Sequence, residues 1–148
     1  ATIEHNKEGG VYKSTDRGQH WKKINALNPR PFYFSRPMQD PLDENRIYVC
    51  GVSLHYSEDA GKTFRAIRLS VHVDNHAIWV NPNDSNHILI GNDGGVFAMG
   101  SAPFKGSAYR KVNPFLPVIA ATGTPSGNGY WLVGIDGSVF AWRRELKR

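Results

Sequence analysis

The octapeptide Ser14-Thr-Asp-Arg-Gly-Gln-His-Trp21 decides how this sequence is understood, because a second copy, Ser57-Glu-Asp-Ala-Gly-Lys-Thr-Phe64, follows it. The aspartates of the two copies, Asp16 and Asp59, are 43 residues apart. An apolar residue recurs at nearly the same interval in four places: Val11, Leu54, Val96 and Val139. A period of this length is typical of proteins built from stacked repeats. The sequence therefore predicts four copies of one structural unit.

The octapeptide has the residues of a turn between two short apolar strands. Its aspartate can accept hydrogen bonds from backbone N–H groups of the turn, and its glycine supplies a positive φ. The serine can add another bond to the backbone, and the final aromatic ring is expected to be buried. The residues with these structural roles are Ser14, Asp16, Gly18, Trp21, Ser57, Asp59, Gly61 and Phe64.

The octapeptides resemble the Asp-box, or BNR, repeat of sialidases, xyloglucanase-like glycosidases and sortilin-type receptors, which are β-propellers. The pattern Ser-x-Asp-x-Gly-x-Thr-Trp/Phe is complete at residues 57–64, and the first copy departs from it only at His20. The resemblance implies that Asp16 and Asp59 are turn residues far from any active face. It transfers no catalytic residue to this chain.

The remaining sequence has no helical period and predicts an all-β fold of propeller blades, about four repeats with the first and last incomplete. We place the blades at residues 1–27, 28–70, 71–113 and 114–148, with three, four, four and three strands. Some of the predicted strands are residues 1–4, 10–14, 21–24, 32–36, 47–50, 53–56, 64–68, 73–80, 88–91, 95–98 and 109–112, with a turn at 81–86.

The last third of the chain differs from the rest. Gly129-Tyr-Trp-Leu-Val133 and Asp136-Gly-Ser-Val-Phe-Ala141 resemble repeats of secreted actinobacterial cell-wall proteins. Residues up to about 95 are closer to sortilin-like or glycosidase-like propellers. We hypothesise that the chain joins fragments of two propeller families, by natural recombination or in the laboratory.

Two incomplete end repeats would leave apolar faces and strand edges open. We expect copies of the chain to close a ring together, since a cyclic arrangement buries both ends identically. An excised fragment and a four-bladed monomer are the alternatives.

Composition excludes several classes of protein. No apolar run approaches the ~20 residues of a membrane span, and nothing resembles a nucleic-acid-binding module. The net charge of +5 is partly concentrated in residues 143–148, which we interpret as a solvated end. The single cysteine, Cys50, lies in an apolar strand and is predicted to be a buried, unreactive thiol. We find no signal peptide, whereas the resemblances imply a secreted or cell-surface origin.

The polar residues with the best spacing for a ligand site are His72, Asp74 and His76. On an extended segment they share one face, beside the central channel where propellers bind ligands. They could contact a ligand or brace the channel, and we predict no metal, because no fourth ligand accompanies them. Arg30 and Tyr33 occupy the corresponding place in the second repeat and suit a carboxylate or a sugar, or an ordinary surface corner.

A glycosidase needs two facing carboxylates, and Asp74 has no convincing second. We therefore predict no catalytic residue and no cofactor, and a binding or scaffold protein that takes a carbohydrate or a peptide and pairs with its own copies. A truncated glycoside hydrolase with residual activity is the alternative.

Overall fold

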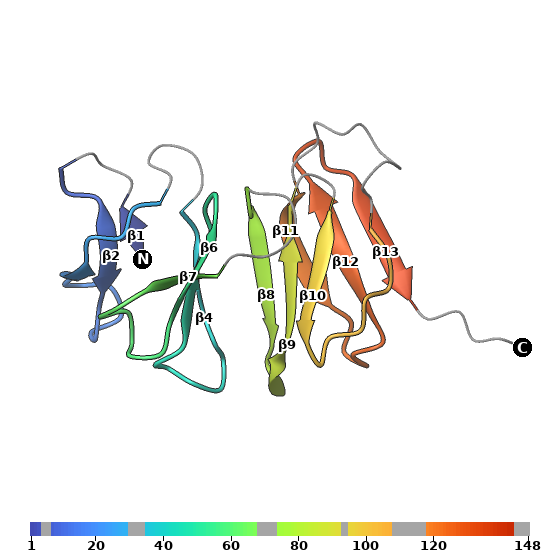
Figure 1. Ribbon diagram of the computed structural model, residues 1–148, viewed down its shortest axis with the longest axis horizontal. Helices are drawn as coiled ribbons and strands as arrows, with labels where there is room; N and C mark the ends of the chain where they lie inside the picture. Colours follow the sequence, from blue (N-terminus) through green and yellow to red (C-terminus); the bar gives the residue numbers. More distant parts are fainter. Residues whose placement is uncertain (4–6, 30–34, 68–73, 93–94, 108–117, 144–148) are drawn as a thin grey trace, which may run out of the picture. The chain divides into compact units, whose positions relative to one another are not determined.

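The structure, a computed structural model, describes residues 1–3, 7–29, 35–67, 74–92, 95–107 and 118–143. These residues form β-strands and turns without any helix, which confirms the predicted all-β fold. The strands make antiparallel sheets in two compact units, Ala1–Val73 and Asp74–Arg148. Figure 1 shows the strands of each unit.

The first unit holds two sheets. One has the order β1-β2-β3, with β1 at Thr2–Ile3, β2 at Gly10–Lys13 and β3 at Lys22–Asn25. The other has the order β4-β5-β6-β7, at Pro37–Gln39, Ile47–Val49, Leu54–Ser57 and Arg65–Ile67. Each octapeptide forms the last hairpin of its sheet, between β2 and β3 and between β6 and β7.

Direct contacts join these two sheets. The Asn25 side-chain amide donates a hydrogen bond of 2.7 Å to the Lys62 carbonyl, and the Thr2 hydroxyl donates to the Ser35 carbonyl. A Cβ atom at Gly61 would lie 2.8 Å from Ile24 Cδ1 and 3.4 Å from Ile47 Cδ1. The second octapeptide turn therefore packs closely against β3 of the first sheet.

The second unit also holds two sheets. One has the order β10-β9-β8, with β8 at Ala77–Asn81, β9 at Asp84–Gly91 and β10 at Val96–Gly100. The other has the order β11-β12-β13, at Val118–Gly123, Gly129–Gly134 and Val139–Arg143. The core between them includes the fully buried Leu89 and Leu132, with Tyr130 beside them.

The two faces of the β11-β12-β13 sheet differ sharply. Tyr130 and Leu132 of β12 are buried in the core, so the alternating Trp131 and Val133 lie on the other face. Val139 pairs with Val133 on that face, and it is 64% exposed. Trp131, Val133 and Val139 thus form an apolar face, and Ile135, in the turn that follows β12, is 61% exposed.

Several predicted strand bounds change in the structure. Ser35 and Arg36 precede β4 instead of ending a strand at 32–36, although the Cys50 N–H still donates to the Arg36 carbonyl at 2.9 Å. The predicted turn at 81–86 is wrong in extent, because Asn81 and Asp84 already pair across the two residues between them. Residues 30–34 and the predicted strand 109–112 lie outside the described residues.

The tryptophans differ in burial, and the prediction of a buried ring at the end of the octapeptide is wrong for Trp21. Trp21 is 51% exposed and Trp131 is 39% exposed, whereas Trp79 and Trp142 pack against the core of the second unit. Cys50 is fully buried, which confirms the prediction of a buried thiol, and burial raises the pKa of this thiol to about 12.

Candidate functional site

The two octapeptide turns have the same hydrogen bonds. The Ser14 hydroxyl donates to Asp16 Oδ1 at 2.7 Å, and the Ser57 hydroxyl donates to Asp59 Oδ1 at 2.8 Å. Four residues after each serine, a backbone N–H donates back to the hydroxyl, at 2.8 Å from Gly18 and 2.9 Å from Gly61. The serine and aspartate side chains thus hold each turn from inside.

The second oxygen of each aspartate has a different partner in the two turns. Asp59 Oδ2 accepts a hydrogen bond of 2.6 Å from the Thr63 hydroxyl, and Asp16 Oδ2 lies 2.5 Å from His20 Nδ1. The histidine that departs from the repeat pattern therefore reaches the same oxygen as the threonine.

These bonds stabilise the charged form of both aspartates. The His20 backbone N–H, then the Ser14 hydroxyl and the His20 ring, lower the pKa of Asp16 to about 2. The Thr63 hydroxyl and then its backbone N–H lower the pKa of Asp59 to about 2. Both carboxylates are engaged within their own turns, which suits a structural role better than proton transfer.

The predicted ligand-binding residues are only partly described. Arg30, Tyr33 and His72 lie outside the described residues. Asp74 has a φ of +72°, so the backbone is not extended at that residue, and the shared face of His72, Asp74 and His76 stays a prediction. His76 is 7% exposed, and its backbone N–H donates to the Gly91 carbonyl at 3.0 Å.

Metal ligands do not gather in the part of the chain that the structure describes: it contains no group of three or more His, Cys, Asp or Glu residues placed to hold an ion. Within the same residues, no helix is long and apolar enough to cross a membrane.

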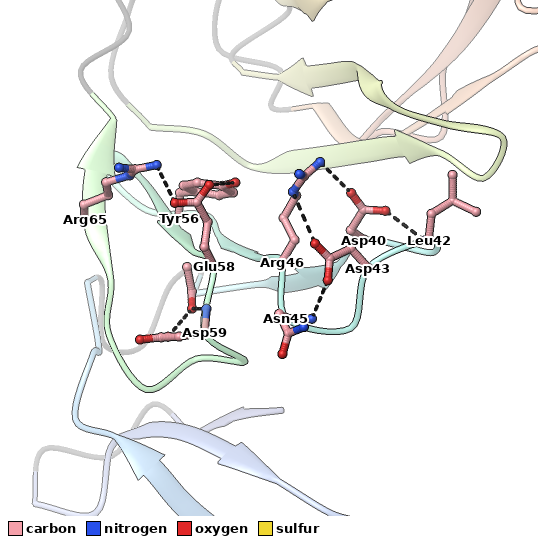
Figure 2. Close-up of polar contacts among 10 residues, drawn as sticks. Asp40, Leu42, Asp43, Asn45, Arg46, Tyr56, Glu58, Asp59 and Arg65 are labelled. Atoms are coloured by element: carbon pink, nitrogen blue, oxygen red, sulfur yellow. Dashed lines mark hydrogen bonds and ion pairs between the residues drawn. The ribbon is translucent and has the colours of Figure 1, made fainter.

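The β4-β5-β6-β7 sheet carries a polar network that includes a buried carboxylate. Asp40, 2% exposed, accepts a hydrogen bond of 2.8 Å from the Leu42 N–H, and its other oxygen lies 3.3 Å from Arg46 Nη1. Figure 2 shows Arg46 extended between Asp40 and Asp43. Both Asp40 oxygens are thus engaged by its own hairpin, which leaves neither positioned as a catalytic acid.

A second set of contacts lies on the following strands. The Tyr56 hydroxyl donates to Glu58 Oε1 at 2.8 Å, and Arg65 Nη2 lies 2.8 Å from Glu58 Oε2 (Figure 2). The Arg65 guanidinium also lies over the Tyr56 ring, 5.1 Å from its centre. These groups satisfy one another, and they indicate a cross-strand ladder more than a ligand site.

The first unit contains a cavity of about 630 Å³ between its two sheets. Its lining includes Tyr12, Arg17, Trp21, Gln39, Glu44 and Ile47. We did not predict it, because its lining comes from two repeats that only the fold brings together. One signal was present: the first turn has Arg17 and Trp21 where the second has Ala60 and Phe64.

Comparisons with known proteins are informative about the fold. No family model and no curated protein matches the sequence. The structure of an ancestral GH74 enzyme superposes with a TM-score of 0.68 and 20% identity, over 90% of this chain. The chain spans about 20% of the length of that enzyme. The structure of YCF48 bound to D1 peptide matches with a TM-score of 0.37 and 13% identity, over 95% of this chain and 60% of that one.

The likeness to the GH74 enzyme at 20% identity concerns the fold alone. It agrees with the short antiparallel sheets, the absence of helix from the described residues and the hairpin turns set one repeat apart. The fold of this chain is that of a β-propeller.

Proposed function

We propose that this protein is a non-enzymatic β-propeller scaffold and binding module, built from Asp-box-like blades at residues 1–27, 28–70, 71–113 and 114–148. In this proposal, copies of the chain complete a ring together, and the mouth of its channel takes a carbohydrate or a peptide. The observation that carries the proposal is the apolar face formed by Trp131, Val133 and Val139 on the last sheet.

Blades of a propeller cover one another's apolar faces, so an apolar outer face on a last blade favours a further blade against it. A second copy of the chain is one source of that blade. The small share of the GH74 enzyme that this chain spans is consistent with a ring that one copy does not complete.

The test is the molar mass in solution, measured by light scattering during size-exclusion chromatography. We expect a multiple of 16.5 kDa that persists on dilution into the micromolar range. A mass of 16.5 kDa at all concentrations would overturn the proposed assembly.

A truncated glycoside hydrolase is the second candidate, favoured by the fold shared with the GH74 enzyme. Asp74 is the carboxylate that such an activity would use. The test compares hydrolysis of a panel of aryl glycosides by the parent and by Asp74→Ala. Equal background rates of hydrolysis in the parent and in Asp74→Ala would support the scaffold proposal. A rate that falls in Asp74→Ala would support the glycoside hydrolase instead.

A further inference from the structure

The cavity of the first unit has features that the scaffold proposal does not use. It lies between the β1-β2-β3 and β4-β5-β6-β7 sheets, and its volume of about 630 Å³ falls within the roughly 300–1,000 Å³ of small-molecule sites. We propose that it is a binding site for a short oligosaccharide that carries a carboxylate. This inference goes beyond the proposed assembly and depends on the cavity alone.

Trp21 supplies a fixed aromatic surface in this cavity. Its indole N–H donates a hydrogen bond of 2.9 Å to the Gly18 carbonyl, and its ring lies over the turn, where a Cβ at Gly18 would be 3.6 Å from Cζ2. The ring is nevertheless 51% exposed. Because the polar end of the indole is already satisfied, the exposed part is apolar and held in place, which suits stacking against the apolar face of a sugar ring.

The second octapeptide turn is a natural comparison. Phe64 also lies over the glycine of its own turn, with a Cβ at Gly61 placed 3.6 Å from Phe64 Cζ. In that turn, however, Ile24 and Ile47 already fill the space beside Gly61, and Phe64 is half-buried. The same turn therefore covers its ring in part in the second copy and presents it to a cavity in the first.

The polar groups of the cavity determine the class of sugar. Lys13 and Arg17 supply two cations, Glu44 supplies one carboxylate, and Gln39 supplies an amide that can donate to and accept from hydroxyl groups. The cation excess favours a ligand with a carboxylate, and a guanidinium binds that group with two parallel hydrogen bonds. An apolar peptide would leave these charged groups without partners.

The backbone at Arg17 offers a clean way to remove one cation. Arg17 has a φ of +59°, a conformation that L-residues resist and glycine accepts. Arg17→Gly therefore deletes the guanidinium without straining the turn. Trp21→Phe keeps an aromatic ring and gives a milder variant beside Trp21→Ala.

The experiment is titration of the full chain with oligomers of galacturonic acid and, separately, of uncharged galactose, followed by calorimetry and by the indole N–H signals in a ¹⁵N spectrum. We expect the acidic oligomer to bind and to shift the Trp21 signal, and the uncharged oligomer to bind several-fold more weakly. Trp21→Ala should weaken binding about tenfold, a loss of 1.4 kcal/mol. In Arg17→Gly, the affinity for the acidic oligomer should fall to the affinity for the uncharged oligomer.

Phe104→Ala is the matched control, because it removes a 61% exposed aromatic side chain that neither lines the cavity nor belongs to the apolar face of the last sheet. It should leave binding unchanged, and thermal melts establish that each variant is folded. Absence of binding at millimolar oligomer, equal affinity for the two oligomers, or undiminished binding by folded Trp21→Ala would each overturn the proposal. If Trp21→Ala instead changes the molar mass and no oligomer binds, a second copy occupies the cavity and the saccharide proposal is wrong.

Discussion

Asp16 and Asp59 stabilise equivalent turns by the same means but with different last partners. A serine hydroxyl and a backbone N–H reach one oxygen of each carboxylate, and either a histidine ring or a threonine hydroxyl reaches the other. The repeat thus specifies that both aspartate oxygens accept hydrogen bonds, but it does not specify which side chain donates to the second oxygen. Because the bonds favour the charged carboxylate, both turns link folding to pH.

We predict that Asp59→Asn removes part of the acid sensitivity of folding. The folded pKa of about 2 lies below the unfolded value of 3.8, so the aspartate stabilises the folded chain above pH 4 and loses this contribution as the pH falls towards 2. Urea unfolding from pH 7 to pH 2 should show a lower free energy of unfolding for Asp59→Asn at neutral pH and a smaller decrease on acidification.

Thr63→Val serves as the control for this experiment, since it removes the hydrogen bond that lowers the Asp59 pKa most and keeps the carboxylate. Its acid sensitivity should lie between that of the parent and that of Asp59→Asn. An Asp59→Asn variant whose stability falls with acid as steeply as the parent's would contradict the prediction.

Ala60 has a backbone conformation that is unfavourable for alanine. Its φ is +60°, a left-handed conformation that costs an L-residue roughly 1–2 kcal/mol. Replacing alanine by glycine costs roughly 0.4–1 kcal/mol through the greater freedom of the unfolded chain. We therefore predict that Ala60→Gly raises the free energy of unfolding by about 0.5–1 kcal/mol.

Ala66→Gly tests whether this gain comes from the backbone. Ala66 is the exposed middle residue of β7, where glycine should destabilise by roughly 0.5–1 kcal/mol. The same substitution a few residues apart should thus have opposite signs in urea unfolding. Two losses of equal size would show that the left-handed conformation of Ala60 carries no cost.

At the scale of elements, packing between the sheets of the second unit depends on glycines that lie opposite side chains of the neighbouring sheet. In the second unit, Gly123 at the end of β11 lies against Trp79 of β8, and a Cβ there would be 2.8 Å from Trp79 Cζ2. Gly91 of β9 has a similar relation to Val118, with a Cβ at 2.8 Å from Cγ1. The two sheets approach closely because these positions have no side chain.

We predict that Gly123→Ala destabilises the chain by roughly 1–3 kcal/mol, because the added methyl group overlaps the indole ring and the core must shift. Gly95→Ala is the matched control, since a Cβ at Gly95 would have its nearest neighbour at 3.5 Å. Thermal and urea unfolding of the two variants should separate clearly. A Gly123→Ala variant as stable as Gly95→Ala would mean that the two sheets are not packed in this way.

The sequence carried much of this element-scale information. Asp16, Gly18 and their counterparts specify a turn through bonds within a few residues, so the hairpins and the all-β fold could be predicted from short-range chemistry. The strand bounds followed within a few residues in most places. The sequence pattern was sufficient to predict structure wherever the stabilising interactions join residues close together in the chain.

What the sequence did not predict depends on contacts between repeats. Trp21 and Phe64 have the same place in the octapeptide, but only the neighbouring sheet decides which ring is covered. The positive φ of Asp74 could not be predicted from the residue type alone, although aspartate is among the residues that accept this conformation most readily. The cavity, whose lining comes from two repeats, could therefore not be predicted from the sequence, whereas Asp74 could be named as a candidate.

For the whole molecule, the question is what covers the apolar face of the last sheet. Trp131 and Val139 lie on it with exposed fractions of 39% and 64%, opposite a face that is buried in the core. In a propeller such a face packs on a neighbouring blade, and the proposed assembly places a second copy there. A charge on this face should then disturb the assembly while leaving the fold of each chain intact.

We predict that Val139→Glu shifts the chain to a molar mass of 16.5 kDa at concentrations where the parent is a multiple of it. The substitution should change the unfolding free energy of the separated chain by less than about 0.5 kcal/mol, because Val139 is exposed there. In an assembly, it would bury an unpaired carboxylate in place of an apolar contact, and each 1.4 kcal/mol lost weakens association about tenfold. Leu42→Glu, at a 59% exposed residue of a hairpin in the first unit, should leave the mass unchanged. A Val139→Glu chain that keeps the parent's mass would show that this face is not the one through which copies associate.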